Sequence, residues 1–181
     1  MRVLLVSENR CRENMVPWPI GAACIASAAS AAGHEVMGLD LMFSADAAAE
    51  VAGAIAEFSP DCVGISVRNI DNQEMKDNVF FMPAVRDVVE AARASTSAPL
   101  VLGGAGFTIF PLECLRYTGC GLGIVGEGEV SFVALLGRLE SGAALDGLAG
   151  LAMVRDGRGT INPPGPPTEP AGLPGFPRCQ H

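Results

Sequence analysis

Short apolar runs alternate with longer helical segments along most of this chain. The first run, RVLLVS at residues 2–7, is nearly continuous, which is typical of a strand covered on both faces. Similar runs follow at residues 36–41, 61–67 and 98–104, and a fifth begins near Gly121. This alternation predicts an open, doubly wound α/β fold, with a mainly parallel five-stranded sheet of the flavodoxin-like or Rossmann-like type.

The segments between these runs have the length and composition of helices. Residues 18–33 and 46–60 are rich in alanine, residues 80–96 form the next helical segment, and a short helix is expected at residues 111–117. A last helix is expected in EVSFVALLGRLESG. Because parallel crossovers are right-handed, every loop from strand to helix should lie on one edge of the sheet.

The alternation stops near Gly150. The segment LAMVRDGRGTIN predicts two short strands around Asp156-Gly157, which is a hairpin signal. The proline-rich residues that follow have the composition of a linker. We therefore divide the chain into an α/β domain at 1–145, a hairpin extension at 146–162 and a linker at 163–181. The linker is either a free tail or a connection toward a further domain.

Charge and composition narrow the class of partner. The formal net charge is −8 and the pI is about 4.7, so the chain offers no basic surface to nucleic acid or to an anionic membrane. No apolar run is long enough to span a bilayer, and the first residues do not resemble a signal peptide. The six cysteines form no C-x-x-C pair or metal-ligand set, so we expect free thiols and a cytoplasmic location.

Four loops should form the ligand edge, at residues 7–20, 66–71, 103–110 and 126–129. The first contains no glycine-rich phosphate motif, which disfavours the usual nucleotide cofactors. A phosphorylatable aspartate at the end of the third strand is also missing, which excludes a receiver domain. The third loop, GGAGFTIF, has two explanations: its glycines serve backbone geometry, or they remove side chains where a ligand lies.

An ordered set of segments, rather than any single motif, carries a family resemblance. The segments are PWPIGAACIASAASAAGHEVMGLDL, DCVGISV, LVLGGAGFTIFPLECL, IVGEGEVSFVALLGRLESG and LDGLAGLAMVRDGRGTINPP. This set resembles the N-terminal cobalamin-binding domain of cobalamin-dependent radical SAM enzymes, many of which are methyltransferases. The resemblance implies cobalamin at the carboxyl edge of the sheet, facing a barrel that binds S-adenosylmethionine and a 4Fe–4S cluster.

The cluster motif of that barrel, C-x-x-x-C-x-x-C, is absent from this sequence. The chain should therefore not catalyse a reaction alone, and we assign it no catalytic or metal-binding residue. The partner expected within the full-length protein is the radical SAM domain. The alternative, from a different class, is a stand-alone α/β domain that binds a nucleotide or a regulatory protein partner at the same edge.

The resemblance also implies which residues contact cobalamin, with Arg68 closing its lower face and Thr108 donating a hydrogen bond. Many cobalamin proteins have D-x-H-x-x-G after the first strand, but here that loop is SENRCRENM. His34 should lie at the opposite edge and His181 in the tail, so we expect base-off cobalamin without a histidine ligand. The expected cofactor-binding residues are Ser7, Pro19, Gly21, Ser66, Val67, Arg68, Gly103, Gly104, Gly106, Thr108, Gly126, Glu127 and Gly128.

Overall fold

A computed structural model describes residues 1–11 and 16–165 and contains one seven-stranded sheet with strand order β2-β1-β3-β4-β5-β6-β7. Five parallel strands come first in the chain, and an antiparallel pair follows. They are β1 (Arg2–Glu8), β2 (Glu35–Asp40), β3 (Cys62–Val67), β4 (Leu100–Gly103), β5 (Leu122–Ile124), β6 (Leu151–Arg155) and β7 (Arg158–Ile161). The predicted winding is confirmed. The hairpin is also present, and it continues the sheet beyond β5.

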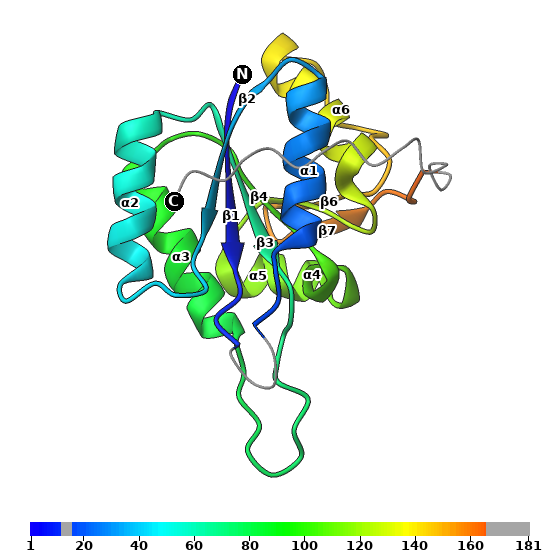
Figure 1. Ribbon diagram of the computed structural model, residues 1–181. Coiled ribbons are helices and arrows are strands. Elements are labelled where there is room, and N and C mark those ends of the chain that lie inside the picture. Colours follow the sequence, from blue (N-terminus) through cyan, green and yellow to red (C-terminus); the bar gives the residue numbers. More distant parts are fainter. Residues whose placement is uncertain (12–15, 166–181) are drawn as a thin grey trace.

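Helices cover both faces of the sheet (Figure 1). Alternate residues of β1 point to opposite layers: Val3 and Leu5 pack with α1 and α6, whereas Leu4 and Val6 pack with α2 and α3. Because β1, β3 and β4 lie inside the sheet and are covered on both sides, their sequences are largely apolar. The helices are α1 (Ile20–Ala31), α2 (Ala47–Phe58), α3 (Met82–Ser95), α5 (Pro111–Thr118) and α6 (Gly128–Ser141).

One expected loop contains a helix. Residues 103–110 were predicted as a loop, but they include the short helix α4 (Ala105–Ile109). Gly104, with a φ of 98°, turns the chain sharply after β4 and allows the helix to begin at the next residue. Phe107 is fully buried against Gly123, where no side chain competes for the space. Burial of this one aromatic ring explains why so short a helix forms.

The segment between β3 and α3 projects beyond the carboxyl edge of the sheet (Figure 1). Its own polar side chains hold it together: the Asn72 Oδ1 atom accepts the Val79 N–H at 2.9 Å, and the Asn72 amide donates to the Asp77 carbonyl at 2.8 Å. Near its base, the rings of Phe80 and Tyr117 meet edge to face at 5.8 Å. The segment is therefore a braced extension, longer than the predicted loop at 66–71.

No helix within residues 1–11 and 16–165 combines the length and the apolar character needed to cross a membrane.

Candidate functional site

Three residues predicted for the site stand in one row across the sheet. Ser7 of β1 is the register partner of Ser66 of β3, and Ser66 is the register partner of Gly103 of β4. The row crosses the point between β1 and β3 where the strand order reverses. In open α/β sheets, ligands bind beyond the carboxyl ends of the strands at such a switch point. The topology therefore brings Ser7, Ser66 and Gly103 together at the expected position.

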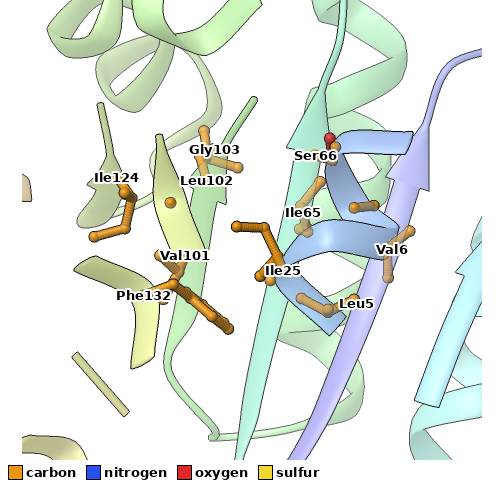
Figure 2. A pocket seen from close by; sticks show the side chains of 14 residues that line it. Leu5, Val6, Ile25, Ile65, Ser66, Val101, Leu102, Gly103, Ile124 and Phe132 are labelled. Carbon is orange, nitrogen blue, oxygen red and sulfur yellow. The ribbon is translucent and has the colours of Figure 1, made fainter. Parts of the chain in front are cut away.

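An apolar slot opens below this row, between the sheet and helices α1 and α6 (Figure 2). Its volume is about 60 Å³. Leu5 and Val101 line it from the strands, and Ile25 and Phe132 line it from the helices. We did not predict these four residues, because an apolar residue that lines a slot looks the same in sequence as one in a closed core. Among the predicted residues, Gly21, Ser66, Gly103 and Gly128 also line the slot.

The glycines of the GGAGFT segment have two different roles. A β-carbon on Gly103 would meet only the Ile124 carbonyl oxygen, at 3.8 Å, so this glycine leaves space at the mouth of the slot. Gly104 has a positive φ, and a β-carbon there would lie 2.6 Å from the Val67 carbonyl oxygen. A β-carbon on Gly106 would come within 3.0 Å of the Arg68 backbone. Backbone geometry therefore requires Gly104 and Gly106, whereas Gly103 provides room.

Thr108 links two of the predicted loops. Its hydroxyl donates to the Gly104 carbonyl at 3.1 Å and accepts the Gly126 backbone N–H at 3.0 Å. The sequence predicts that this hydroxyl donates to the cofactor; in the structure its single proton points to the Gly104 carbonyl. Thr108 thus holds the start of α4 in a fixed position relative to the loop before α6.

The remaining predicted residues surround this core of the site. The Val67 side chain is fully buried in the core on the α2–α3 side, so only its backbone reaches the edge. Because Ser66 and Val67 point to opposite faces, any contact of Val67 with the cofactor would be made by its backbone. Arg68 and Glu127 are exposed, and Pro19 directly precedes α1.

At the end of β1, a buried carboxylate forms an ion pair with a partly exposed arginine, which we did not predict. The Glu8 side chain is 3% exposed, and its Oε1 accepts the Arg10 Nε–H at 2.8 Å. Burial raises the pKa of the Glu8 carboxyl, and the hydrogen bond and charge of Arg10 only partly oppose this effect. A glutamate at the end of a strand ordinarily lies in water, so the sequence carried no signal for this arrangement.

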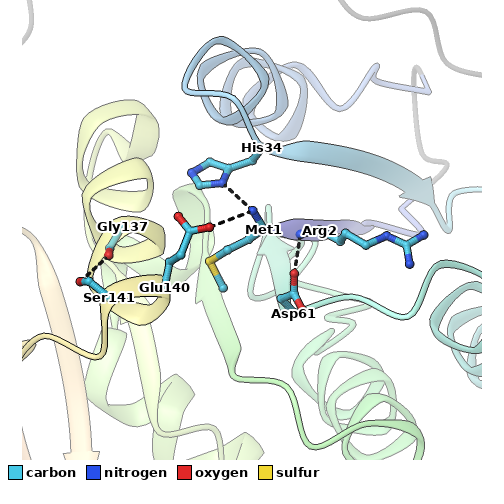
Figure 3. Close-up of polar contacts among 7 residues, drawn as sticks. All are labelled: Met1, Arg2, His34, Asp61, Gly137, Glu140 and Ser141. Carbon is cyan, nitrogen blue, oxygen red and sulfur yellow. Dashed lines mark hydrogen bonds and ion pairs between the residues drawn. The ribbon is translucent and has the colours of Figure 1, made fainter.

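His34 lies at the amino edge of the sheet, as predicted (Figure 3). Its Nδ1 atom is 3.3 Å from the α-amine of Met1, which is also 3.4 Å from the Glu140 carboxylate. Among residues 1–11 and 16–165, no group of three or more His, Cys, Asp or Glu side chains could hold a metal ion. His181 lies outside the described residues.

A parallel sheet with a switch point, a polar and glycine row at its carboxyl edge and an apolar slot beneath define an α/β cofactor-binding domain. The family model of the B12 binding domain matches residues 14–136, which is more than half of the chain. The chain therefore belongs to the B12 binding domain family. The cofactor expected from the sequence, cobalamin, is the one that this family binds.

Two curated relatives are methyltransferases. The tryptophan 2-C-methyltransferase of Streptomyces laurentii is 28% identical over 171 residues, covering 91% of this chain and 28% of the relative. The cytidylyl-2-hydroxyethylphosphonate methyltransferase of Streptomyces wedmorensis is 32% identical over 115 residues, covering 63% of this chain and 20% of the relative. The chain thus spans less than a third of the length of either relative.

Solved structures agree with the fold. The radical S-adenosylmethionine methyltransferase TsrM from Kitasatospora setae, solved with cobalamin and a 4Fe–4S cluster, matches with a TM-score of 0.84 and 30% identity. The match covers 90% of this chain and 30% of TsrM. The cobalamin-dependent radical enzyme OxsB, with aqua-cobalamin bound, has a TM-score of 0.73 at 16% identity and supports the fold alone.

Proposed function

We propose that this chain is the cobalamin-holding part of a larger cobalamin-dependent radical SAM methyltransferase. The observation that carries the proposal is the Ser7–Ser66–Gly103 row, which lies at the switch point directly above an apolar slot. Family membership and the methyltransferase activity of the relatives support the same conclusion. When bound, cobalamin supplies a carrier for a methyl group, and the residues of this chain hold and orient it.

The slot fits one part of cobalamin better than the others. The corrin ring carries amide groups around its rim, whereas the benzimidazole lower base is flat and largely apolar. A β-carbon on Gly21 would meet nothing within 4 Å, so the entrance beside Gly103 is open from the α1 side as well. We assign the lower base to the slot and the corrin rim to the polar row at the carboxyl edge.

The predicted site residues keep distinct roles in this proposal. Ser66 lines the slot, and Arg68, the exposed residue directly after the same strand, would close the lower face of the ring. Gly126 and Glu127 directly precede α6, and we assign them to a second wall of the site. Gly104, Gly106 and Thr108 act indirectly, because they fix the backbone conformation of the loops that contact the cofactor.

The larger protein is part of the same proposal. Residues 1–145 and the hairpin extension at 146–162 hold the cofactor, and residues 163–181 lead toward a radical SAM domain. That domain would supply the 4Fe–4S cluster, S-adenosylmethionine and most contacts to the substrate. The relatives are about three times as long as this chain, which leaves ample length for such a domain.

Equilibrium dialysis against hydroxocobalamin tests cofactor binding directly. We expect the chain to retain the cofactor at tens of micromolar, and Gly103→Val to abolish retention by filling the mouth of the slot. Gly38→Val is the matched control, because Gly38 lies in β2 of the same sheet and a β-carbon there would meet nothing within 4 Å. Lack of retention by the folded wild-type chain would overturn the proposal.

A further inference from the structure

The slot offers almost no hydrogen-bonding groups to a ligand. Fourteen residues line it, and Ser66 is the only one with a polar side chain (Figure 2). The backbone gives little more, because β3 is paired on both sides, with β1 and with β4. In Figure 2 the Ser66 oxygen lies at one end of the slot, whereas Leu5, Ile25 and Phe132 surround its interior.

Such a lining penalises polar atoms on any ring that enters. A ring nitrogen or exocyclic amine that leaves water and finds no hydrogen-bond partner in the slot weakens binding, because its desolvation free energy is not compensated. A single hydroxyl at the mouth can satisfy one ring nitrogen, but not several nitrogens spread around a ring. The slot therefore matches a flat ring with a hydrocarbon edge and one free nitrogen.

Room for the ring has to come from one side chain. At about 60 Å³ the slot is much smaller than the roughly 300 Å³ or more of usual small-molecule sites. The Ile25 Cδ1 atom lies 2.7 Å from where a β-carbon of Gly128 would stand, so Ile25 closes the gap between α1 and α6. Entry of a flat bicyclic base therefore requires Ile25 to change its rotamer. Because a purine and a benzimidazole are both flat bicyclic rings, the slot cannot discriminate between them by size. Any discrimination has to come from the polarity of its lining.

We propose that this slot selects among cobalamin-type cofactors by their lower base, taking a benzimidazole base in preference to adenine. The inference rests on the proposed function, in which the lower base enters the slot. Adenine presents several ring nitrogens and an amino group, and most of them would lie against Leu5, Val101 and Phe132 without partners. The dimethylbenzimidazole base of cobalamin would present its hydrocarbon edge and methyl groups to the same walls.

Dissociation constants measured by equilibrium dialysis for three cofactors test the selection. These are cobalamin, the analogue with adenine as lower base, and cobinamide, which has no lower base. We expect cobalamin to bind at least tenfold more tightly than the adenine analogue, and cobinamide to bind more weakly than cobalamin. Equal binding of cobalamin and cobinamide would show that the slot holds no base and would overturn the inference while cobalamin binding stands.

Two other results of the same measurement overturn the inference. Equal or tighter binding of the adenine analogue, with cobinamide weaker, would show that the base enters a site without this preference. Failure of the folded chain to bind any of the three would remove the proposed function, and the inference with it. The three-cofactor comparison uses the wild-type chain and does not depend on any variant.

A matched pair of variants locates the selection within the slot. Val101→Thr adds one hydroxyl to the slot wall with little change of shape, and should reduce the preference for cobalamin over the adenine analogue several-fold. Val63→Thr makes the same change in β3, where Val63 is equally buried but packs on the opposite face of the sheet. It should leave the preference unchanged. An equal effect of both variants would contradict the assignment.

Discussion

The Thr108 hydroxyl accepts the backbone N–H of Gly126 at 3.0 Å while donating to the carbonyl of Gly104 at 3.1 Å. One side chain thus joins the loop after β4 to the loop before α6, which are the two glycine-containing walls of the candidate site. We expect Thr108→Val to weaken hydroxocobalamin binding about tenfold, or about 1.4 kcal/mol, because valine cannot form the hydrogen bonds that join the two loops.

Thr108→Ser serves as the control, since serine keeps the hydroxyl and should restore most of the affinity. Dialysis and urea unfolding are measured on both variants. Equal weakening by serine and valine would contradict the bridging role.

Gly104 and Gly103 should respond differently to the same substitution. Gly104→Ala places a β-carbon 2.6 Å from the Val67 carbonyl oxygen at a φ of 98°, so it should lower the free energy of unfolding by about 1–3 kcal/mol. In Gly103→Ala the β-carbon meets only the Ile124 carbonyl oxygen, at 3.8 Å. This substitution should change the free energy of unfolding by less than about 0.5 kcal/mol. Urea denaturation of both variants checks this. A stable Gly104→Ala protein would show that the turn is not strained.

Glu8 should make the folded state more stable at lower pH than at neutral pH, relative to a variant without the carboxyl. Burial raises the pKa of Glu8 in the folded state above 4.5, its ordinary value in the unfolded chain. At a pH between 4.5 and the raised pKa, the folded state therefore binds the proton more readily than the unfolded chain does. The contribution of Glu8 to stability is therefore greatest below pH 4.5 and is lost as pH rises through the raised pKa.

Urea unfolding of the wild-type chain and of Glu8→Gln at pH 7 and pH 5 measures this difference. Other carboxyls titrate in both proteins and cancel. The free energy of unfolding of the wild-type chain, relative to that of the variant, should be higher at pH 5 than at pH 7. A difference that does not change with pH would be inconsistent with a buried carboxyl.

The cysteines should differ sharply in reactivity. Burial raises the pKa of Cys62 to about 12 and that of Cys114 to about 11, and it also raises the pKa of Cys120. At pH 8 these thiols are almost entirely protonated and therefore poor nucleophiles. A thiol reagent such as DTNB should modify the partly exposed Cys11 and Cys24 in the folded chain, and the other three only after unfolding.

A Cys179→Ser background removes the one cysteine outside the described residues. Labelling of Cys62 at a rate similar to that of Cys24 would show that the sheet opens far more readily than its packing suggests.

Cobalt(II) in the bound cofactor should show no axial nitrogen in its electron paramagnetic resonance spectrum. His34 contacts the Met1 amine at the amino edge, on the far side of the sheet from the Ser7–Ser66–Gly103 row. It is therefore out of reach of the metal. Nitrogen superhyperfine splitting that persists in His34→Ala would indicate that the lower base coordinates cobalt instead of occupying the slot.

The winding of the sheet could be predicted because each buried strand has its own uninterrupted apolar run. The side-chain directions could have been predicted further: Ser66 and Val67 are neighbours in one strand, so both could not face the same ligand. Leu5, Ile25, Val101 and Phe132 could not be assigned to a slot from sequence, because packing in three dimensions alone separates slot from core. The same holds for Thr108, whose partner Gly126 is eighteen residues away.

The hairpin that continues the sheet determines which strand edge the domain presents to other molecules. Without β6 and β7, the short strand β5 would end the sheet with unpaired backbone groups, which invite pairing with a second chain. With them, the outermost strand is β7, which has four residues, starts at Arg158 and is soon followed by Pro163. Short length, a positive charge and proline all hinder the addition of another strand. Protection of this edge of the sheet, opposite the β2 edge, therefore resides in residues that follow the last helix, and truncation before Leu151 should cost solubility.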